Sequence, residues 1–542
     1  MASKHTGRGR GRKFVPIQKP NGTIHPRVQA VGPEHFAVIS VDCAKRRSKW
    51  MVADFYGKVL SPPKEVCHTR GDFDAAILSI RETCQRFDIR DCVVGVERAG
   101  NYHQPARRAF LQANFDVRIV HSFTTKQFRQ PANPGDKTDE TDLAAIHRAV
   151  VNGFGLIERP LDPLARELRL LVRHRRDLVD KATLLCNQLR EHLGLAMPGY
   201  CECFDPLWTL DFPLFVARHS GSADQLLALG ADGLKALLKK AGIQYHAPSV
   251  DKALAWARTA PPADPDAKSL HRVWTFLEDD RQAKNQEIQR LERDILALLV
   301  QTRYVRLLAI PGVALVTAAE FAGEMGPIEH YSNAKAVTGR AGLYPSRYQS
   351  DAVDRANGPL VRCRNRSLRA AIMLVADCLL KSNRHFRSLA EVWKAKGKDP
   401  VGNHVRVAGR FCRIAYAVVA GEAPFAHPAI KDRDYVLAKL LILHRQLGAP
   451  ADATLANLQA ACNQVPQAEH AAEADALKRL LPCGRSGRGR QPRLLGDVIP
   501  ALLAKLLGKV VECPPSGERP SSEPKRDLGT NNVFRPLGAN PG

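Results

Sequence analysis

The chain has 542 residues, of which 80 are Lys or Arg and 55 are Asp or Glu, so its formal net charge is +25. This length allows two to four domains with substantial cores, and the basic surplus favours polyanionic partners, nucleic acid first among them. The composition argues against a membrane or exported protein, because no segment approaches the ~20 apolar residues of a membrane span and no apolar stretch follows the basic start.

The cysteines argue against structural zinc and against a disulfide framework. The chain has 13 of them, scattered and odd in number. None forms Cys-x-x-Cys, and Cys201-Glu-Cys203 has no matching second pair. A reducing cytoplasm fits this pattern.

Residues 1–34 are predicted to form a disordered basic arm, because Gly7-Arg-Gly-Arg-Gly-Arg12 cannot bury apolar surface. Residues 35–158 then alternate strand and helix patterns. The predicted order is a strand ending at Asp42, a hairpin over 50–60, a helix near 71–87, a strand ending at Glu97, a helix near 103–114, a strand at 117–120 and a final helix that carries Asp142. A hairpin followed by strand–helix units predicts an α/β domain of the ribonuclease-H or RuvC type.

The remainder is predicted to be all-α. Leucines recur at steps near 3.5 over residues 162–193 and again over 270–298, which predicts an antiparallel coiled coil with a helical insert over residues 159–300. The same spacing is equally typical of two helices in an ordinary bundle. Arg175 fills one heptad position of the first helix.

A compact helical domain is expected over residues 301–425. Its Leu308-Ala-Ile-Pro-Gly-Val313 segment is typical of a helix-hairpin-helix turn that offers backbone N–H groups to a phosphate, and equally of a plain packing corner. An extra helical region is expected over 426–512 and a disordered tail over 513–542.

Four acidic residues occupy positions that a nuclease-type metal site would need. Asp42 and Glu97 each end a predicted strand, while Asp139 and Asp142 lie three residues apart at the start of a predicted helix and so share one face. Several carboxylates together can hold one or two Mg²⁺ ions over a phosphodiester. Each acid alone is more often a cap or an ion-pair partner, so the order of the four is what favours phosphate chemistry.

A second motif lies farther along the chain: Gly339-Arg-Ala-Gly-Leu343-Tyr-Pro345, then Ser350, then Asn365-x-x-Leu368-Arg369. Together with Val41-Asp42-x-x-Lys45, Gly95-x-Glu97 and Lys137-Thr-Asp139-x-x-Asp142, this motif resembles the DEDD transposases of bacterial insertion sequences over roughly residues 35–420. That family joins a RuvC-like N-terminal domain, a coiled coil and a C-terminal transposase domain.

The resemblance implies a site and a reaction. Asp42, Glu97, Asp139 and Asp142 would bind a divalent metal, Mg²⁺ or Mn²⁺, and Ser350 would attack DNA to give a covalent phosphoserine link. The implied partners are DNA at the element ends and at the target, a structured noncoding RNA that guides the enzyme, and further copies of the chain in a dimer or tetramer. The implied setting is the bacterial cytoplasm, in association with the nucleoid.

The chain departs from the family pattern at two places. Asp351 stands where the family has a glycine after the serine, and Arg364 replaces the glycine of the family's Lys-x-Gly-Asn. Ser346 lies close enough to compete with Ser350 for the nucleophile's role.

Three alternatives stay open. A RuvC-like junction resolvase that uses water would need the acids but not Ser350, and a silent nucleic-acid-binding relative would need neither. An actin-like kinase shares the sheet topology, but the sequence has none of the glycine-rich phosphate loops that such a kinase would use.

Overall fold

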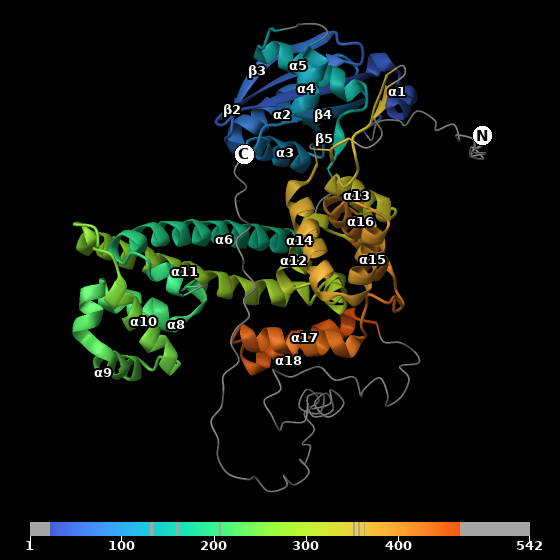
Figure 1. Cartoon of the computed structure of the whole chain (residues 1–542). Coiled ribbons are helices and arrows are strands. Elements are labelled where there is room, and N and C mark those ends of the chain that lie inside the picture. Colours follow the sequence, from blue (N-terminus) through green and yellow to red (C-terminus); the bar gives the residue numbers. More distant parts are fainter. Residues whose placement is uncertain are drawn as a thin grey trace, which may run out of the picture. The chain divides into compact units, whose positions relative to one another are not determined.

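The computed structural model describes residues 22–130, 135–158, 162–204, 207–350, 353–355, 358–361 and 364–466. They belong to two compact units that divide at residue 160, and each unit is treated by itself below (Figure 1). In both units, the helices that the structure describes are too short or too polar to cross a membrane.

The first unit is built on a six-stranded mixed sheet in the order β3-β2-β1-β4-β5-β6. The strands are β1 (Phe36–Cys43), β2 (Arg47–Asp54), β3 (Val59–Cys67), β4 (Asp91–Arg98), β5 (Val117–His121) and β6 (Leu156–Ile157). β1, β2 and β3 form an antiparallel meander, β1, β4 and β5 run parallel, and β6 is antiparallel to β5. The mixed sheet and its order are consistent with the predicted ribonuclease-H-like domain.

Helices cover both faces of this sheet (Figure 1). They are α1 (His25–Val31), α2 (Arg70–Arg86), α3 (His103–Gln112), α4 (Ser122–Arg129) and α5 (Asp139–Val151). Alternate residues of β1 separate two cores: Ile39 and Val41 pack with α2 and α3, whereas Phe36 and Val38 pack with α1 and α5. Because side chains alternate along a strand, Asp42 falls on the face that α5 covers.

The prediction of a disordered arm to residue 34 is wrong for its last part. Val28 of α1 and Ile24, the residue just before this helix, are buried in the core, and Arg27 forms ion pairs with Asp91 and Asp116. The basic composition hid a short apolar stripe, because two buried side chains four residues apart suffice once a sheet is there to receive them. Residues 1–21 lie outside the described residues.

The second unit begins with two long helices, α6 (Pro163–Ala196) and α11 (Ala267–Leu299), that run antiparallel along each other (Figure 1). Leucines of the predicted heptads, such as Leu168, Leu178 and Leu189, are buried. Arg175 is also buried and pairs with Glu292 of α11 at 2.6 Å. The polar heptad position therefore has a charged partner inside the interface.

A helical insert joins these two helices and has its own core around Tyr200, Trp256 and Trp274. Its described elements are α7 (Tyr200–Cys203), η2 (Leu207–Thr209), α8 (Asp211–Ser220), α9 (Ala223–Ala241) and α10 (Ala247–Thr259).

A second, larger core holds the rest of this unit together. Its elements are η3 (Arg303–Ala309), α12 (Leu315–Met325), η4 (Ile328–His330), α13 (Ala334–Ala341), the hairpin β7 (Tyr348–Ser350) and β8 (Val353–Arg355), α14 (Arg366–Ser382), α15 (Arg384–Ala395), α16 (Pro400–Ala420), α17 (Arg433–Gln446) and α18 (Ala451–Gln464). α17 and α18 contribute Val436, Leu440 and Leu458 to the same core, so this part of the C-terminal extension is integral to the unit. The predicted elements beyond residue 466 lie outside the described residues.

The Pro311-Gly312 turn is a packing corner. A Cβ at Gly312 would lie 3.1 Å from the carbonyl oxygen of Cys378 on α14, and the Lys439 Nζ of α17 donates to the Leu308 and Val313 carbonyls on either side of the turn. These contacts favour the packing interpretation over a phosphate-binding turn.

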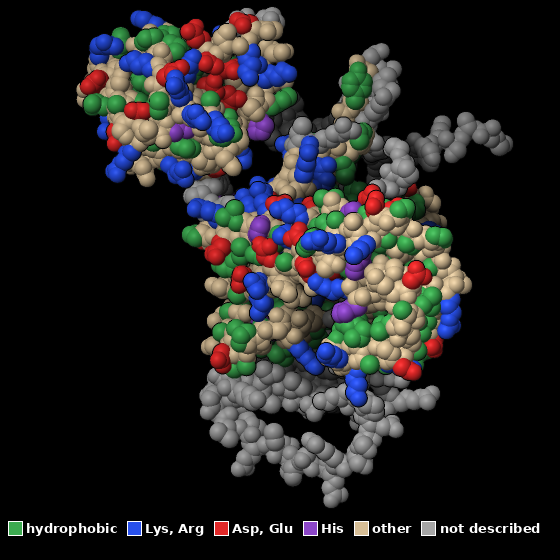
Figure 2. Space-filling model, turned by 90° about the vertical axis from the view of Figure 1, so that its left-hand side faces the viewer, with side chains coloured by type: hydrophobic (Ala, Val, Ile, Leu, Met, Phe, Trp, Pro, Cys, Tyr) green, Lys and Arg blue, Asp and Glu red, His purple; other side chains and the backbone are tan. Residues whose placement is uncertain are grey.

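Surface charge is mixed on the face drawn in Figure 2. Lys and Arg side chains are interspersed with Asp and Glu over both units there. The positive surplus is therefore not gathered into one patch on that face, and particular sites have to be found from the contacts of individual residues.

Candidate metal centre

Three of the four predicted acids meet at one edge of the first sheet. β1 and β4 are parallel with Val41 opposite Val96, so the next residues, Asp42 and Glu97, stand side by side at the carboxyl ends of their strands. Asp142 reaches them from α5, and carboxylate oxygens of the three lie within 4.8 Å of one another. Asp142 is buried, while Asp42 and Glu97 are half-buried.

The local sequence explains why α5 arrives at this place. Thr138 caps the helix by accepting from the Thr141 N–H, and the Thr141 hydroxyl accepts from the Thr138 N–H in return. Ile146 and Val150 then pack onto β4 at Gly95, where a Cβ would lie 2.6 Å from a Val150 methyl. The glycine of the Gly95-x-Glu97 motif is thus the position that lets the helix approach the sheet.

Asp139 does not join the three. It is the first residue of α5, it is exposed, and its carboxylate pairs with Lys49 Nζ of β2 at 2.7 Å. Lys49 stands directly opposite Asp42 in the antiparallel register. Asp139 therefore lies near the cluster with its charge neutralised by a lysine, and its role as a metal ligand stays a prediction.

A further residue, Arg129, forms an ion pair with Asp142. Arg129 is the last residue of α4, and both side chains are largely buried, at 13% exposure for Arg129 and 7% for Asp142. A guanidinium can hold one carboxylate oxygen and leave the other available, so it orients the acid. No sequence motif marks Arg129; only the packing of α4 beside α5 reveals it.

The acids of the cluster repel one another, and nearby positive charges only partly offset this repulsion. Burial, then repulsion from Asp42 and Asp142, raises the pKa of Glu97 to about 7. Burial and the neighbouring Asp142 and Asp139 also raise the pKa of Asp42. Positive charge at this edge comes from Lys49, Arg129 and Lys137. The charge of Lys137 acts to lower the pKa of Asp42 and Glu97, against the larger effect of burial.

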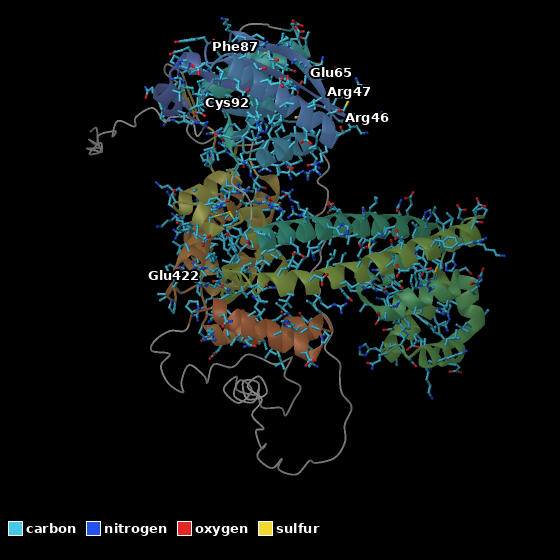
Figure 3. All side chains as sticks on the ribbon, turned by 180° about the vertical axis from the view of Figure 1, so that it is seen from behind. Arg46, Arg47, Glu65, Phe87, Cys92 and Glu422 are labelled. Atoms are coloured by element: carbon cyan, nitrogen blue, oxygen red, sulfur yellow. The ribbon has the colours of Figure 1, made fainter. Side chains whose placement is uncertain are left out.

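An exposed ion pair also lies near this edge. Figure 3 shows Arg46, Arg47 and Glu65 together at one end of the sheet, with Cys92 toward the other end. Arg47 Nη1 donates to Glu65 Oε2 at 3.2 Å, so this exposed pair lies beside the acid cluster without adding to it.

The donor set fits a hard divalent cation. Three carboxylates converge, and Mg²⁺ and Mn²⁺ prefer oxygen ligands of this kind. A cation would relieve the repulsion that raises the pKa of Asp42 and Glu97. Asp42, Glu97 and Asp142 are the residues that would hold it.

Metal-free protein is expected to lose stability as the pH rises through this cluster's titration. Glu97 binds its proton more tightly in the folded state, so its contribution is favourable below its ordinary pKa of 4.5 and is lost as the pH approaches about 7. Because a metal needs deprotonated ligands, MgCl₂ should raise the melting temperature more at about pH 8 than at about pH 5. Scanning calorimetry at both values tests this, with Glu97→Gln as the variant that should lose the difference; equal shifts at both values would contradict it.

Ser350 and Ser346 lie in the second unit. Ser350 is exposed at the end of β7, whereas the half-buried Ser346 donates its hydroxyl to the Pro359 carbonyl at 2.9 Å. The hydroxyl of Ser346 therefore holds the base of the hairpin, while Ser350 stands near its tip. Asp351 lies outside the described residues; Arg364 bonds the Tyr344 hydroxyl at 3.0 Å.

The motifs on either side of this hairpin fasten its roots. Arg369 bonds the carbonyls of Ala341, at 2.8 Å, and Val361, so it ties the entry of the hairpin to its exit. It crosses directly over Gly342, which has a positive φ of 66° and no room for a Cβ. Asn365 caps α14 through Leu368 N–H and donates to the buried Glu324 at 2.8 Å.

Comparisons with known proteins match both regions. Residues 39–198 match a transposase family of the DEDD, IS110 type, and residues 304–391 match the transposase family IS116/IS110/IS902. A probable family 20 transposase of Pseudomonas aeruginosa is 23% identical over 354 residues, which covers 63% of this chain and 90% of the relative. An uncharacterized 44.8 kDa protein of the insertion element IS116 from Streptomyces clavuligerus is 26% identical over 311 residues, which covers 57% of this chain and 75% of that protein.

Proposed function

Because this chain belongs to the IS110-type family of DEDD transposases, enzymes that transfer phosphoryl groups of DNA, we propose that it cuts and rejoins DNA strands through a covalent bond to Ser350. The observation that carries the proposal is the convergence of Asp42, Glu97 and Asp142 in one unit, with an exposed serine on a firmly rooted hairpin in the other. A divalent cation, Mg²⁺ or Mn²⁺, is the cofactor that the three acids would hold.

The acids and the serine have separate tasks. When bound, the cation would supply positive charge to the phosphodiester oxygens. Arg129 holds Asp142 in place, and Lys49 holds Asp139 beside the other three acids. A serine hydroxyl is a weak nucleophile at neutral pH and needs such an environment or a base to react.

The covalent step conserves the phosphodiester. A bond forms between Ser350 Oγ and phosphorus as the bond from phosphorus to one deoxyribose oxygen breaks. The proton of the hydroxyl passes to a base, and the released sugar oxygen takes up a proton. The reverse step rejoins a strand without ATP, which recombination requires and plain hydrolysis does not.

RNA guidance and assembly belong to the same proposal. A net charge of +25 suits a protein that binds an RNA and two DNA duplexes, and base pairing with a guide RNA would then read the sequence. Exchange of strands between two DNA molecules needs at least two active subunits, so the enzyme would act as a dimer or tetramer.

Covalent trapping tests the serine. Full-length protein is incubated with Mg²⁺, labelled element-end DNA and the flanking transcript, and adducts that survive denaturation are counted. Ser350→Ala is expected to lose the adduct completely, and Ser346→Ala should retain it because that hydroxyl bonds the Pro359 carbonyl.

The outcomes separate the alternatives. If Ser350→Ala still cuts DNA and wild type forms no adduct, the enzyme is a hydrolytic resolvase that relies on the acids alone. If wild type binds DNA and RNA but does not cut, the chain is a silent binding relative. An adduct that survives in Ser350→Ala and disappears in Ser346→Ala would move the nucleophile to Ser346.

A further inference from the structure

The second unit contains a basic hollow that neither the acid cluster nor the serine hairpin uses. It has a volume of about 450 Å³ and lies among α13, α15 and α16, of which α13 and α15 each pack against α16 (Figure 1). Its charged lining is Lys335, Arg406, Arg410 and Arg413, and its apolar lining includes Trp393 and Leu343. This volume is within the ~300–1,000 Å³ range of small-ligand sites, so it could take one base with its sugar but not a double helix.

The four cationic side chains of the hollow face the same space. Arg406, Arg410 and Arg413 recur at steps of four and three residues, which places them on one face of α16, and Lys335 of α13 lines the same hollow. All four side chains are exposed.

These charges have no acidic partner within the described part of the chain. Arg406 bonds the neutral amide of Asn403 at 2.7 Å, and none of the four cations forms an ion pair with a described acid. This differs from α6, where Arg173, Arg175 and Arg176 each pair with a glutamate. Four like charges without a counter-charge favour an anion with more than one negative group.

An aromatic surface stands among the cations. The guanidinium of Arg410 lies over the Trp393 ring, 5.2 Å from its centroid, so the indole supports a flat cationic group. Proteins that bind unpaired nucleotides stack bases on aromatic rings and on guanidinium planes, and Leu343 adds an apolar wall.

The surface continues into a second hollow of about 320 Å³ that shares Arg410 and Arg413. His385, Phe386 and His427 line it, and the ring of His427 stacks on Phe425 with an interplanar angle of 9°. Burial lowers the pKa of His385 and His427, so both offer neutral rings. Two hollows with aromatic walls therefore flank one pair of arginines.

We propose that α13, α15 and α16 bind unpaired nucleotides, with successive bases in the two hollows and the phosphate between them on Arg410 and Arg413. The inference rests on the proposed function in one respect: both require that the chain binds nucleic acid. It assigns this surface to a single strand, and the strand can come from RNA or from DNA.

The test measures binding by full-length protein to short labelled strands. Fluorescence anisotropy compares single-stranded RNA, single-stranded DNA and duplex DNA of one sequence. Arg410→Ala/Arg413→Ala is expected to weaken single-strand binding by about 10- to 100-fold, since each stacked base contributes on that scale. The slope of log affinity against log salt should become shallower by about 0.7, because the one phosphate held by both arginines loses its contact.

The matched control is Arg258→Ala/Arg272→Ala, which removes two exposed arginines from the same unit, at the insert and the start of α11. Duplex affinity should fall no more in the test variant than in this control. Arg410→Lys/Arg413→Lys should keep the salt slope and recover only part of the affinity, because lysine keeps the charge and lacks the flat group.

The RNA and DNA arms identify the source of the strand. A larger loss with RNA assigns the surface to the guide, and a larger loss with DNA assigns it to an opened DNA end. An equal loss for single strands and duplex, or a loss no greater than in the control, overturns the proposal. These measurements follow binding and not cleavage, so failure of the catalytic proposal does not affect this result.

Discussion

Asp42→Asn is expected to lower DNA cleavage by about 10³-fold or more, since a bound metal contributes several kcal/mol to the transition state of phosphoryl transfer. The same change should raise the melting temperature of the metal-free protein. Asp42 stands beside Glu97 and Asp142, with ligand oxygens within 4.8 Å, and an amide has no charge to repel them. Activity and stability are therefore expected to change in opposite directions.

Cleavage assays with Mg²⁺ and thermal melting without it test this pair of effects. Glu140→Gln is the matched control: it removes one negative charge from the exposed surface of the same region, and it should leave both quantities nearly unchanged. A variant that cuts like wild type would show that Asp42 is not a ligand. A variant that is inactive but less stable would point to a structural role instead.

The second large effect concerns stability and centres on Glu324 of α12. Its side chain is 2% exposed and accepts from Arg173 at 2.7 and 3.0 Å and from Asn365 at 2.8 Å. Burial works to raise its pKa, but the Arg173 and Asn365 hydrogen bonds outweigh burial and hold the pKa below its ordinary value. Its stabilising contribution is thus present above pH 4.5 and is lost as the pH falls.

Glu324→Ala is expected to lower the free energy of unfolding by about 1–3 kcal/mol, because hydrogen-bond donors of Arg173 and Asn365 lose their acceptor. Arg169, at 20% side-chain exposure, would remain in place without its nearest acid. Denaturant unfolding at neutral pH measures the loss.

Glu320→Ala provides the comparison on the same helix. Glu320 is also buried and pairs with Arg176 at 2.8 Å, but burial outweighs that pairing and raises its pKa. Its removal should therefore be less destabilising than that of Glu324. If the two variants are equally stable, the network around Glu324 is not a main support of the unit. Asn365, which bonds Glu324, is the N-cap of α14, the helix that follows the serine hairpin. Glu324→Ala should therefore also reduce formation of the serine–DNA adduct by more than the loss of folded protein explains.

Sequence patterns were sufficient to predict where Asp42 and Glu97 lie in the fold. Both end apolar runs that could only be buried strands, and parallel strands bring their carboxyl ends to one edge. The leucine spacing of α6 and α11 also indicated two long helices that pack together, because periodic apolar residues need a partner surface.

Other features depend on contacts that no local pattern specifies. Lys49 neutralises Asp139 only because the β1–β2 register places it opposite Asp42. Arg129 reaches Asp142 from a helix that no motif marks. Glu324 collects partners from α6 and α14, more than forty residues away in the sequence, and α1 depends on a sheet that forms from later residues.

The charged pair inside the α6–α11 interface has a mechanical consequence. Arg175 meets Glu292 where leucines would otherwise interdigitate, and Glu278 and Arg281 bond each other within the same buried stripe. If one helix slid past the other by a heptad, about 10 Å, Arg175 would lose Glu292 and its charge would lie against apolar side chains, which is unfavourable. These buried charges therefore favour one register of α6 against α11. With the register fixed, the distance between the helical insert and the core that carries the serine is fixed as well.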